Sequence, residues 1–144
     1  MKMNKKGVTL IELIVVFAII AIGAVLAVPS FGPWLANYRL RTATRDITSN
    51  LRTAQMRAVS NNVDYQVSFS GGSYILQRNT GGLWVDEGTA QTLPNGISII
   101  PPVNNPLTFS PNSSSNGGTI VLQGARGTQR TITVLPSTAR ITIQ

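Results

Sequence analysis

Residues 7–28, with the sequence GVTLIELIVVFAIIAIGAVLAV, decide how the rest of this chain is organised. The stretch follows a short basic segment and has only two polar side chains, those of Thr9 and Glu12. As an α-helix, residues 8–28 would be about 31 Å long at ~1.5 Å per residue, enough to cross a bilayer core of roughly 30 Å. The flanking lysines would then stay on the cytoplasmic side. The sequence therefore predicts a transmembrane helix over residues 8–28.

Glu12 is the residue that a simple membrane anchor does not explain. A carboxylate costs roughly 2.5–3.5 kcal/mol at the centre of a membrane helix and somewhat less near its end, so we expect Glu12 to have a partner. A secretory signal peptide also has a basic start and an apolar middle, and residues 25–27 resemble a cleavage site. Its apolar region is typically about 7–15 residues long and carries no acid. A signal peptide and a plain anchor remain as alternatives that leave Glu12 unexplained.

The junction at residues 5–13, KKGVTLIEL, resembles the processing signal of type IV pilins and type II secretion pseudopilins. In that family a short basic leader ends in Gly and is followed by a hydrophobic residue, Thr, Leu, a hydrophobic residue, Glu and Leu. The resemblance implies that a prepilin peptidase cuts between Gly7 and Val8 and methylates the new N-terminal amine. Family members usually have Phe where this chain has Val8, and commonly have a helix-kinking proline where it has Pro29. Glu12 matches the acidic residue of the family, and we expect it to pair with the N-terminal amine of a neighbouring subunit and set the register between helices.

Composition limits the chemistry of the rest of the chain. Cys and His are absent, which removes thiol chemistry, disulfides, the commonest general base and the commonest zinc ligand. The five acids are Glu12, Asp46, Asp64, Asp86 and Glu87, whereas a calcium site needs about six to eight oxygen ligands. We expect the adjacent pair, Asp86 and Glu87, to cap a loop. The sequence therefore predicts no catalytic residues, no metal site and no cofactor.

A second helical pattern runs from near Trp34 to about Ser60, after residues 30–33 interrupt the first one. Apolar residues recur along it at steps of three and four, which is the signature of an amphipathic helix. This apolar stripe consists of Leu40, Ala43, Ile47, Leu51, Ala54 and Ala58. We expect the stripe to lie against a sheet. Arg41, Arg45 and Arg52 cluster on another face, which is either solvated or binds a partner.

From residue 61 onward the pattern is that of short strands separated by turn residues. Residues 65–69 and 74–78 form a hairpin signature around a Gly-rich turn. Further strands are predicted at residues 83–85, 97–100, 107–109, 119–123, 131–135 and 140–143, with the Pro-rich residues 101–106 as a rigid loop. The expected fold class is α+β, with a long N-terminal helix packed on an antiparallel, two-sheet β domain.

The predicted organisation has four parts. They are a leader at residues 1–7, a transmembrane and filament-core helix at 8–28, an amphipathic continuation of the helix at 29–60, and a β domain at 61–144.

Basic residues near the C-terminus suggest a further partner. The chain has a formal charge of +7, its lysines all lie in the leader, and no acid follows Glu87. The β portion resembles minor pseudopilin H and the FimT-like pilins, some of which bind DNA during natural transformation through basic residues near the C-terminal loop and strand. Arg126, Arg130 and Arg140 occupy that region, although Ala139 stands where the subfamily often has Gly. These arginines are candidate phosphate contacts, and the alternative is that they solubilise or protect sheet edges.

The resemblance implies a minor pilin or pseudopilin, a structural subunit of a type IV pilus or a type II secretion pseudopilus. Its partners would be the prepilin peptidase, other pilins or pseudopilins and the bacterial inner membrane. It would cross that membrane once, with a cytoplasmic N-terminus and a periplasmic or extracellular C-terminal domain. The alternatives are a DNA-binding pilin for DNA uptake and a secreted β domain with a removable signal.

Overall fold

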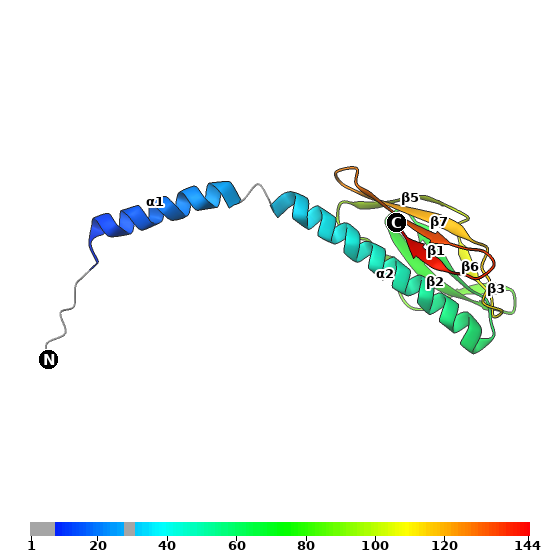
Figure 1. Ribbon diagram of the computed structural model, residues 1–144. Coiled ribbons are helices and arrows are strands. Elements are labelled where there is room, and N and C mark those ends of the chain that lie inside the picture. The colour runs from blue at the N-terminus through cyan, green and yellow to red at the C-terminus, as the bar shows by residue number, and fades with distance from the viewer. Residues whose placement is uncertain (1–7, 28–30) are drawn as a thin grey trace, which may run out of the picture. The chain divides into compact units, whose positions relative to one another are not determined.

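The computed structural model describes residues 8–27 and 31–144 (Figure 1). It divides the chain into two units, Met1–Leu35 and Ala36–Gln144, and each is described by itself. The first unit contains helix α1, Leu10–Ala27, and the start of helix α2, Phe31–Asn61, most of which belongs to the second unit. The predicted leader and Pro29 lie outside the described residues. Among the residues that the structure describes, no helix combines the length and the apolarity needed to cross a membrane.

Helix α2 begins earlier than the sequence pattern suggested. It starts at Phe31, so Pro33 lies within its first turn. A proline is tolerated there because its missing N–H would have no acceptor inside the helix. The prediction that this stretch interrupts the helix is therefore wrong for residues 31–33. At the other end, Asn62 adopts a positive φ of 54°, and the Val63 N–H donates to the Ala58 carbonyl at 3.3 Å, which closes the helix.

The predicted apolar stripe of α2 is the side of the helix that packs into the core. Its six residues are all at most 2% exposed: Leu40, Ala43, Ile47, Leu51, Ala54 and Ala58. Two threonines, Thr44 and Thr48, are buried beside them. Their hydroxyls donate to the carbonyls of Leu40 at 2.7 Å and of Thr44 at 2.8 Å, so their burial leaves no unpaired donor.

Two antiparallel sheets complete the second unit. The first has the order β3-β2-β1-β6, with β4 also pairing with β2, and the second has the order β5-β7-β8-β9. The strands of the first sheet are β1 (Tyr65–Ser70), β2 (Ser73–Thr80), β3 (Leu83–Asp86), β4 (Gln91–Thr92) and β6 (Leu107–Phe109). Those of the second are β5 (Ile97–Val103), β7 (Gly118–Gly124), β8 (Gln129–Val134) and β9 (Ile141–Ile143). The predicted α+β class with two antiparallel sheets is confirmed.

Strands β4 and β5 differ from the predicted pattern. β4 was not predicted, and β5 continues through Pro101 and Pro102 to Val103 instead of ending at Ile100. The register of β5 against β7 is irregular between Ile100 and Val103. Because β5 is an edge strand, its prolines remove no hydrogen bond that a second neighbour would need.

Helix α2 contacts both sheets within the second unit (Figure 1). A Cβ added at Gly124 on β7 would lie 3.8 Å from Leu40 Cδ2, so the start of the stripe faces the second sheet. Farther along the helix, Asn61 Nδ2 donates to the Tyr65 hydroxyl on β1 at 2.7 Å, and Asn50 Nδ2 donates to the Tyr74 hydroxyl on β2 at 3.3 Å. The helix therefore bridges the two sheets over one hydrophobic core.

Tyr74 titrates differently from an exposed tyrosine. Burial raises the pKa of its hydroxyl above the usual 10.0, and the negative charge of Asp46 raises this pKa further. The hydrogen bond from Asn50 acts in the opposite direction and lowers the pKa. The neutral hydroxyl is thus part of the contact between α2 and the first sheet.

Candidate processing and assembly site

The start of α1 is organised by Thr9. The backbone N–H of Glu12 donates to the Thr9 carbonyl at 3.1 Å and to its side-chain Oγ1 at 3.4 Å, and the Leu13 N–H donates to the same carbonyl at 3.2 Å. Thr9 is therefore the N-cap of the helix and Glu12 is its third residue. A Thr followed three residues later by Glu has the spacing of a capping box. Our sequence analysis missed this motif, although the spacing alone carries the signal.

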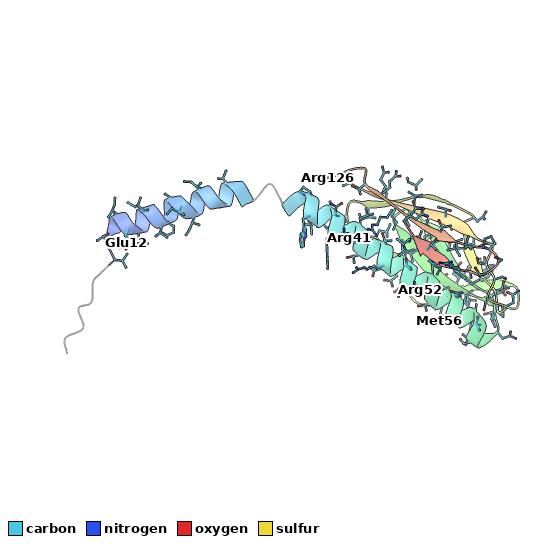
Figure 2. The ribbon with its side chains drawn as sticks, in the orientation of Figure 1. Glu12, Arg41, Arg52, Met56 and Arg126 are labelled. Atoms are coloured by element: carbon cyan, nitrogen blue, oxygen red, sulfur yellow. The ribbon has the colours of Figure 1, made fainter. Side chains whose placement is uncertain are left out.

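Glu12 lies in the first turn of α1, as Figure 2 shows. A carboxylate in this position is favoured by the partial positive charge of the helix N-terminus. The side chain is exposed, and the surface around it is a shallow depression lined by Thr9, Ile11, Val15 and Val16. Glu12 is therefore the single carboxylate of a mainly apolar surface and is available to a positive group.

Val8 precedes α1 and is 70% exposed, whereas Gly7 lies outside the described residues. The structure therefore shows an accessible residue on the C-terminal side of the predicted cleavage site. The peptide bond itself is not described.

Apolar side chains are exposed around the whole of α1. Leu10 is 76% exposed, Phe17 is 64% exposed and Val25 is 73% exposed. A helix that is hydrophobic on every face is normally buried in a membrane or among other helices. Within the described residues of the first unit, nothing supplies that cover.

The three candidate DNA contacts do not form one group. Arg126 lies on the turn between β7 and β8, which is closed by the Gly124 N–H donating to the Thr128 carbonyl at 2.8 Å (Figure 2). Arg130 is four positions farther on and pairs with Leu122 of β7. Both arginines are therefore near the same end of the second sheet.

Arg140 lies at the opposite end of β8. The Leu135 N–H donates to the Arg140 carbonyl at 3.0 Å, and β9 then runs back along β8 so that Gln144 bonds to Thr131. Five positions along β8 separate Leu135 from Arg130, which is about 16 Å at ~3.3 Å per residue. The short sequence distance between Arg130 and Arg140 hence does not bring their backbones together.

The sequence analysis also missed an ion pair between α2 and the loop after β3. Arg57 Nη1 on α2 lies 2.6 Å from Glu87 Oε1. Asp86 Oδ1 accepts a hydrogen bond from Gln77 Nε2 at 2.7 Å, across the register pair that these residues form in β2 and β3. The expectation that Asp86 and Glu87 cap a loop is therefore wrong. Arg57 and Glu87 are 30 residues apart, so no local pattern could reveal their pairing.

Solved structures with this fold define the class of protein. The minor pseudopilin EpsH from the type 2 secretion system of Vibrio cholerae matches with a TM-score of 0.62 and 11% identity, over 74% of this chain and 96% of that one. The type IV minor pilin FimU of Pseudomonas aeruginosa matches with a TM-score of 0.64 and 14% identity, over 78% of this chain and 92% of that one. The chain thus has the fold of minor pilins and pseudopilins.

The family follows from two sequence models. Residues 2–28 match the prokaryotic N-terminal methylation motif, and residues 43–138 match the type II transport protein GspH model. The chain belongs to the GspH family of type II transport proteins. A comparison with curated proteins yields no match.

Membership in this family has direct consequences. The chain is a minor pseudopilin or pilin of a type II secretion system or type IV pilus, a structural protein and not an enzyme. Its methylation motif implies processing by a prepilin peptidase and anchoring in the inner membrane through the N-terminal helix. Proteins of this family assemble with other pseudopilins.

Proposed function

We propose that prepilin peptidase cuts this chain between Gly7 and Val8, methylates the Val8 amine, and thereby creates a subunit that Glu12 guides into a filament. The observation that carries the proposal is the methylation motif over residues 2–28, which includes all three residues. The exposure of Val8 supports access of the peptidase to the cleavage site.

The surroundings of Glu12 support a role in assembly. A lone carboxylate among apolar side chains gains little from staying unpaired in a lipid environment. The methylated amine of a neighbouring subunit carries a positive charge and would pair with it. Such a pair sets the axial position of one helix against the next more clearly than it adds net stability.

The proposed placement has the chain crossing the bacterial inner membrane once, through the helix of residues 8–28. The N-terminus is cytoplasmic because the leader lysines precede the helix, and the β domain is periplasmic or extracellular. In the filament the subunit lies near the tip or starts assembly. The exposed apolar side chains of α1 support a position among lipid or other helices.

Cleavage is tested by mass spectrometry of protein extracted from membranes. The mature chain should begin with methylated Val8. Gly7→Ala should be processed better than Gly7→Val, because the peptidase must accommodate a very small side chain before the cut. A mature chain that begins at Val28 would identify a secretory signal peptide instead and overturn the proposal.

Two variants distinguish the effect of the Glu12 charge from the effect of its capping of α1. Glu12→Gln keeps an acceptor that completes a capping box, whereas Glu12→Val removes both the acceptor and the charge. If the charge sets the register, both variants should enter the membrane normally and both should be captured by partner pilins at a much lower level than wild type. Incorporation of Glu12→Gln at the wild-type level would mean that Glu12 only caps α1.

DNA binding is the second candidate function, and one observation favours it. Arg126 and Arg130 lie near one end of the second sheet, in a part of the chain where the sequence has no acid. Contacts of these two residues to phosphates would make the logarithm of the affinity fall with the logarithm of the salt concentration, with a slope of about −2. The base sequence should matter little, because phosphate contacts carry no sequence information.

A gel-shift titration at two salt concentrations tests this candidate. Replacing Arg126 and Arg130 with Gln should flatten the slope by about two units. Arg140→Gln shows whether the more distant arginine also reaches the duplex, and Arg78→Gln on β2 is a control for the loss of positive charge. If micromolar wild-type protein does not shift DNA at low salt, the protein is a filament subunit only.

A further inference from the structure

The face of α2 that points away from the core has an unusual composition. It consists of Tyr38, Arg41, Arg45, Ser49, Arg52, Met56 and Val59, which we call the arginine face. These residues follow one another at spacings of three or four, which keeps them on one side of an α-helix. The face extends about 31 Å along the helix at ~1.5 Å per residue. Figure 2 shows three of its members, Arg41, Arg52 and Met56, in turn along α2.

The side chains of the arginine face are exposed. Tyr38 is 56% exposed, Met56 is 63% exposed and Val59 is 47% exposed, and all three arginines are exposed as well. In the part of the chain that the structure describes, the one ion pair is that of Arg57 with Glu87, which involves no arginine of this face. The arginine face thus presents three cations that the described residues do not neutralise, next to exposed apolar side chains.

Its composition is that of an interface more than that of a solvated helix surface. Tyr, Met and Arg are enriched where proteins meet, whereas Lys, Glu, Asp and Ser are depleted there. A solvated helix face normally alternates positive and negative side chains. Here all cations are arginines, which are less strongly hydrated than lysines and bind carboxylates through two parallel hydrogen bonds.

The charge of the face determines which partner fits. Asp46 is the only acid in α2, and at about 100° per residue it lies well around the helix from Arg41. A second copy docked through the same face would place arginines against arginines, which is unfavourable across an interface, and its α2 would supply one carboxylate in place of three. A helix with carboxylates at matching intervals would neutralise the three cations and cover Met56 and Val59.

We propose that the arginine face of α2 binds an acid-bearing helix of a different pilin or pseudopilin subunit. This inference rests on the proposed function, because it takes the neighbour to be another subunit of the same filament. It adds the chemistry of that neighbour and makes the contact selective for a different subunit over a copy of the same chain.

The test uses full-length processed protein in neutral detergent and a synthetic amphipathic helix as the probe. The peptide carries Glu at three positions spaced four and seven residues apart, as are Arg41, Arg45 and Arg52, with Leu beside them. A matched peptide has Gln in place of Glu. Fluorescence anisotropy should show preferential binding of the Glu peptide, weakened by salt.

Three sets of variants make the result specific. Replacing Arg41, Arg45 and Arg52 with Gln should weaken binding of the Glu peptide about tenfold, since three exposed ion pairs contribute modestly each. Replacing the exposed Arg78, Arg126 and Arg140 with Gln removes the same charge elsewhere and should have a much smaller effect. Replacing the three face arginines with Glu should transfer the preference to a peptide with Lys in place of Glu.

Each other outcome overturns the inference. Equal binding of the Glu and Gln peptides, or an equal loss in the two triple-Gln variants, would show that the face has no specific role. Tighter, arginine-dependent binding to anionic phosphatidylglycerol vesicles or to duplex DNA would identify a different occupant. Face-dependent dimers in sedimentation would identify a second copy of the chain.

Failure of the inference is distinguishable from failure of the proposed function. If the triple-Gln variant is cleaved before Val8 and is incorporated with partner pilins as wild type is, the proposed function holds and the arginine face is not the contact. If wild-type protein is not cleaved there, the proposed function fails whatever the peptide measurements show.

Discussion

Helix α1 and the second unit of the chain illustrate opposite relations between sequence and structure. In α1 the apolar side chains are exposed, and the informative residues belong to the methylation motif that matches over residues 2–28. In the second unit the apolar side chains are buried in one core, and the fold persists in proteins that are 11% and 14% identical. The motif is local, since it matches as one stretch of the chain. The second unit is held together by residues from distant parts of the chain that pack into one core.

This difference predicts that the two regions respond to different substitutions. Changes in the motif should affect processing and assembly without altering the stability of the second unit. Changes in its core should affect stability without altering cleavage before Val8. The following substitutions test that separation, from the largest expected effect to the smallest.

Leu51→Asp should have the largest effect. Leu51 is 0% exposed, so the new carboxylate would be buried without a partner, at a cost of several kcal/mol. That is a large part of the roughly 5–15 kcal/mol by which domains are stable. Circular dichroism should show loss of the cooperative melting transition, whereas cleavage before Val8 should continue.

Met56→Asp is the matched control on the same helix, because Met56 is 63% exposed. It should leave the melting temperature nearly unchanged. Similar melting curves for Leu51→Asp and wild type would show that the orientation of α2 is wrong.

Gly117→Ala should have an intermediate effect. Gly117 has a φ of 64°, and a Cβ there would lie 2.5 Å from Pro136 Cγ. Left-handed backbone costs roughly 1–2 kcal/mol for a residue with a side chain, and overpacking typically adds about 1–3 kcal/mol. Urea unfolding should therefore show a loss of about 3 kcal/mol in the free energy of unfolding.

Two other glycines provide controls for Gly117→Ala. Gly71 has a φ of 57° but nothing within 4 Å of an added Cβ, so Gly71→Ala should cost only about 1 kcal/mol. Gly23 in α1 also has nothing within 4 Å, and Gly23→Ala should leave the unfolding of the second unit unchanged. Equal losses for Gly117→Ala and Gly71→Ala would mean that contact with Pro136 does not matter.

The fold was predictable where a local pattern reflects burial. The stripe of α2 was readable because burial of one helix face imposes steps of three and four, and the β1–β2 hairpin because a sheet with one buried face imposes alternation. Strand β4 has two exposed residues and exists only through its pairing with β2, so its sequence carries no such pattern. The prediction ended β5 too early, at Ile100, because prolines normally end a strand. Prolines are tolerated in β5 because it is an edge strand, and the order of strands in a sheet cannot be read from the sequence of one strand.

The candidate sites were predictable to the extent that they are local. The methylation motif is one continuous stretch of the chain, so it was visible without any knowledge of the fold, and the roles of Gly7, Val8 and Glu12 within it stay predictions. The pair of Arg57 and Glu87 is 30 residues apart and could not be found in the same way. For Arg130 and Arg140 the sequence misled in the opposite way. The two residues are near each other in the sequence, but they lie at different ends of β8.

Tyr74→Phe should have the smallest effect, and it should appear mainly at alkaline pH. The second unit has no Cys and no Lys, whose side chains would also titrate at alkaline pH. Because the pKa of Tyr74 is higher in the folded state than its usual 10.0, the folded protein holds this proton more tightly than the unfolded chain. The associated stability is fully present below pH 10.0 and is lost as the pH rises through the folded-state pKa. At pH 7, loss of the hydrogen bond from Asn50 should cost only about 0.5–1 kcal/mol. Urea unfolding at neutral and alkaline pH should therefore show a shallower alkaline decline for Tyr74→Phe than for wild type, and parallel declines would show that Tyr74 does not couple the contact between α2 and β2 to pH.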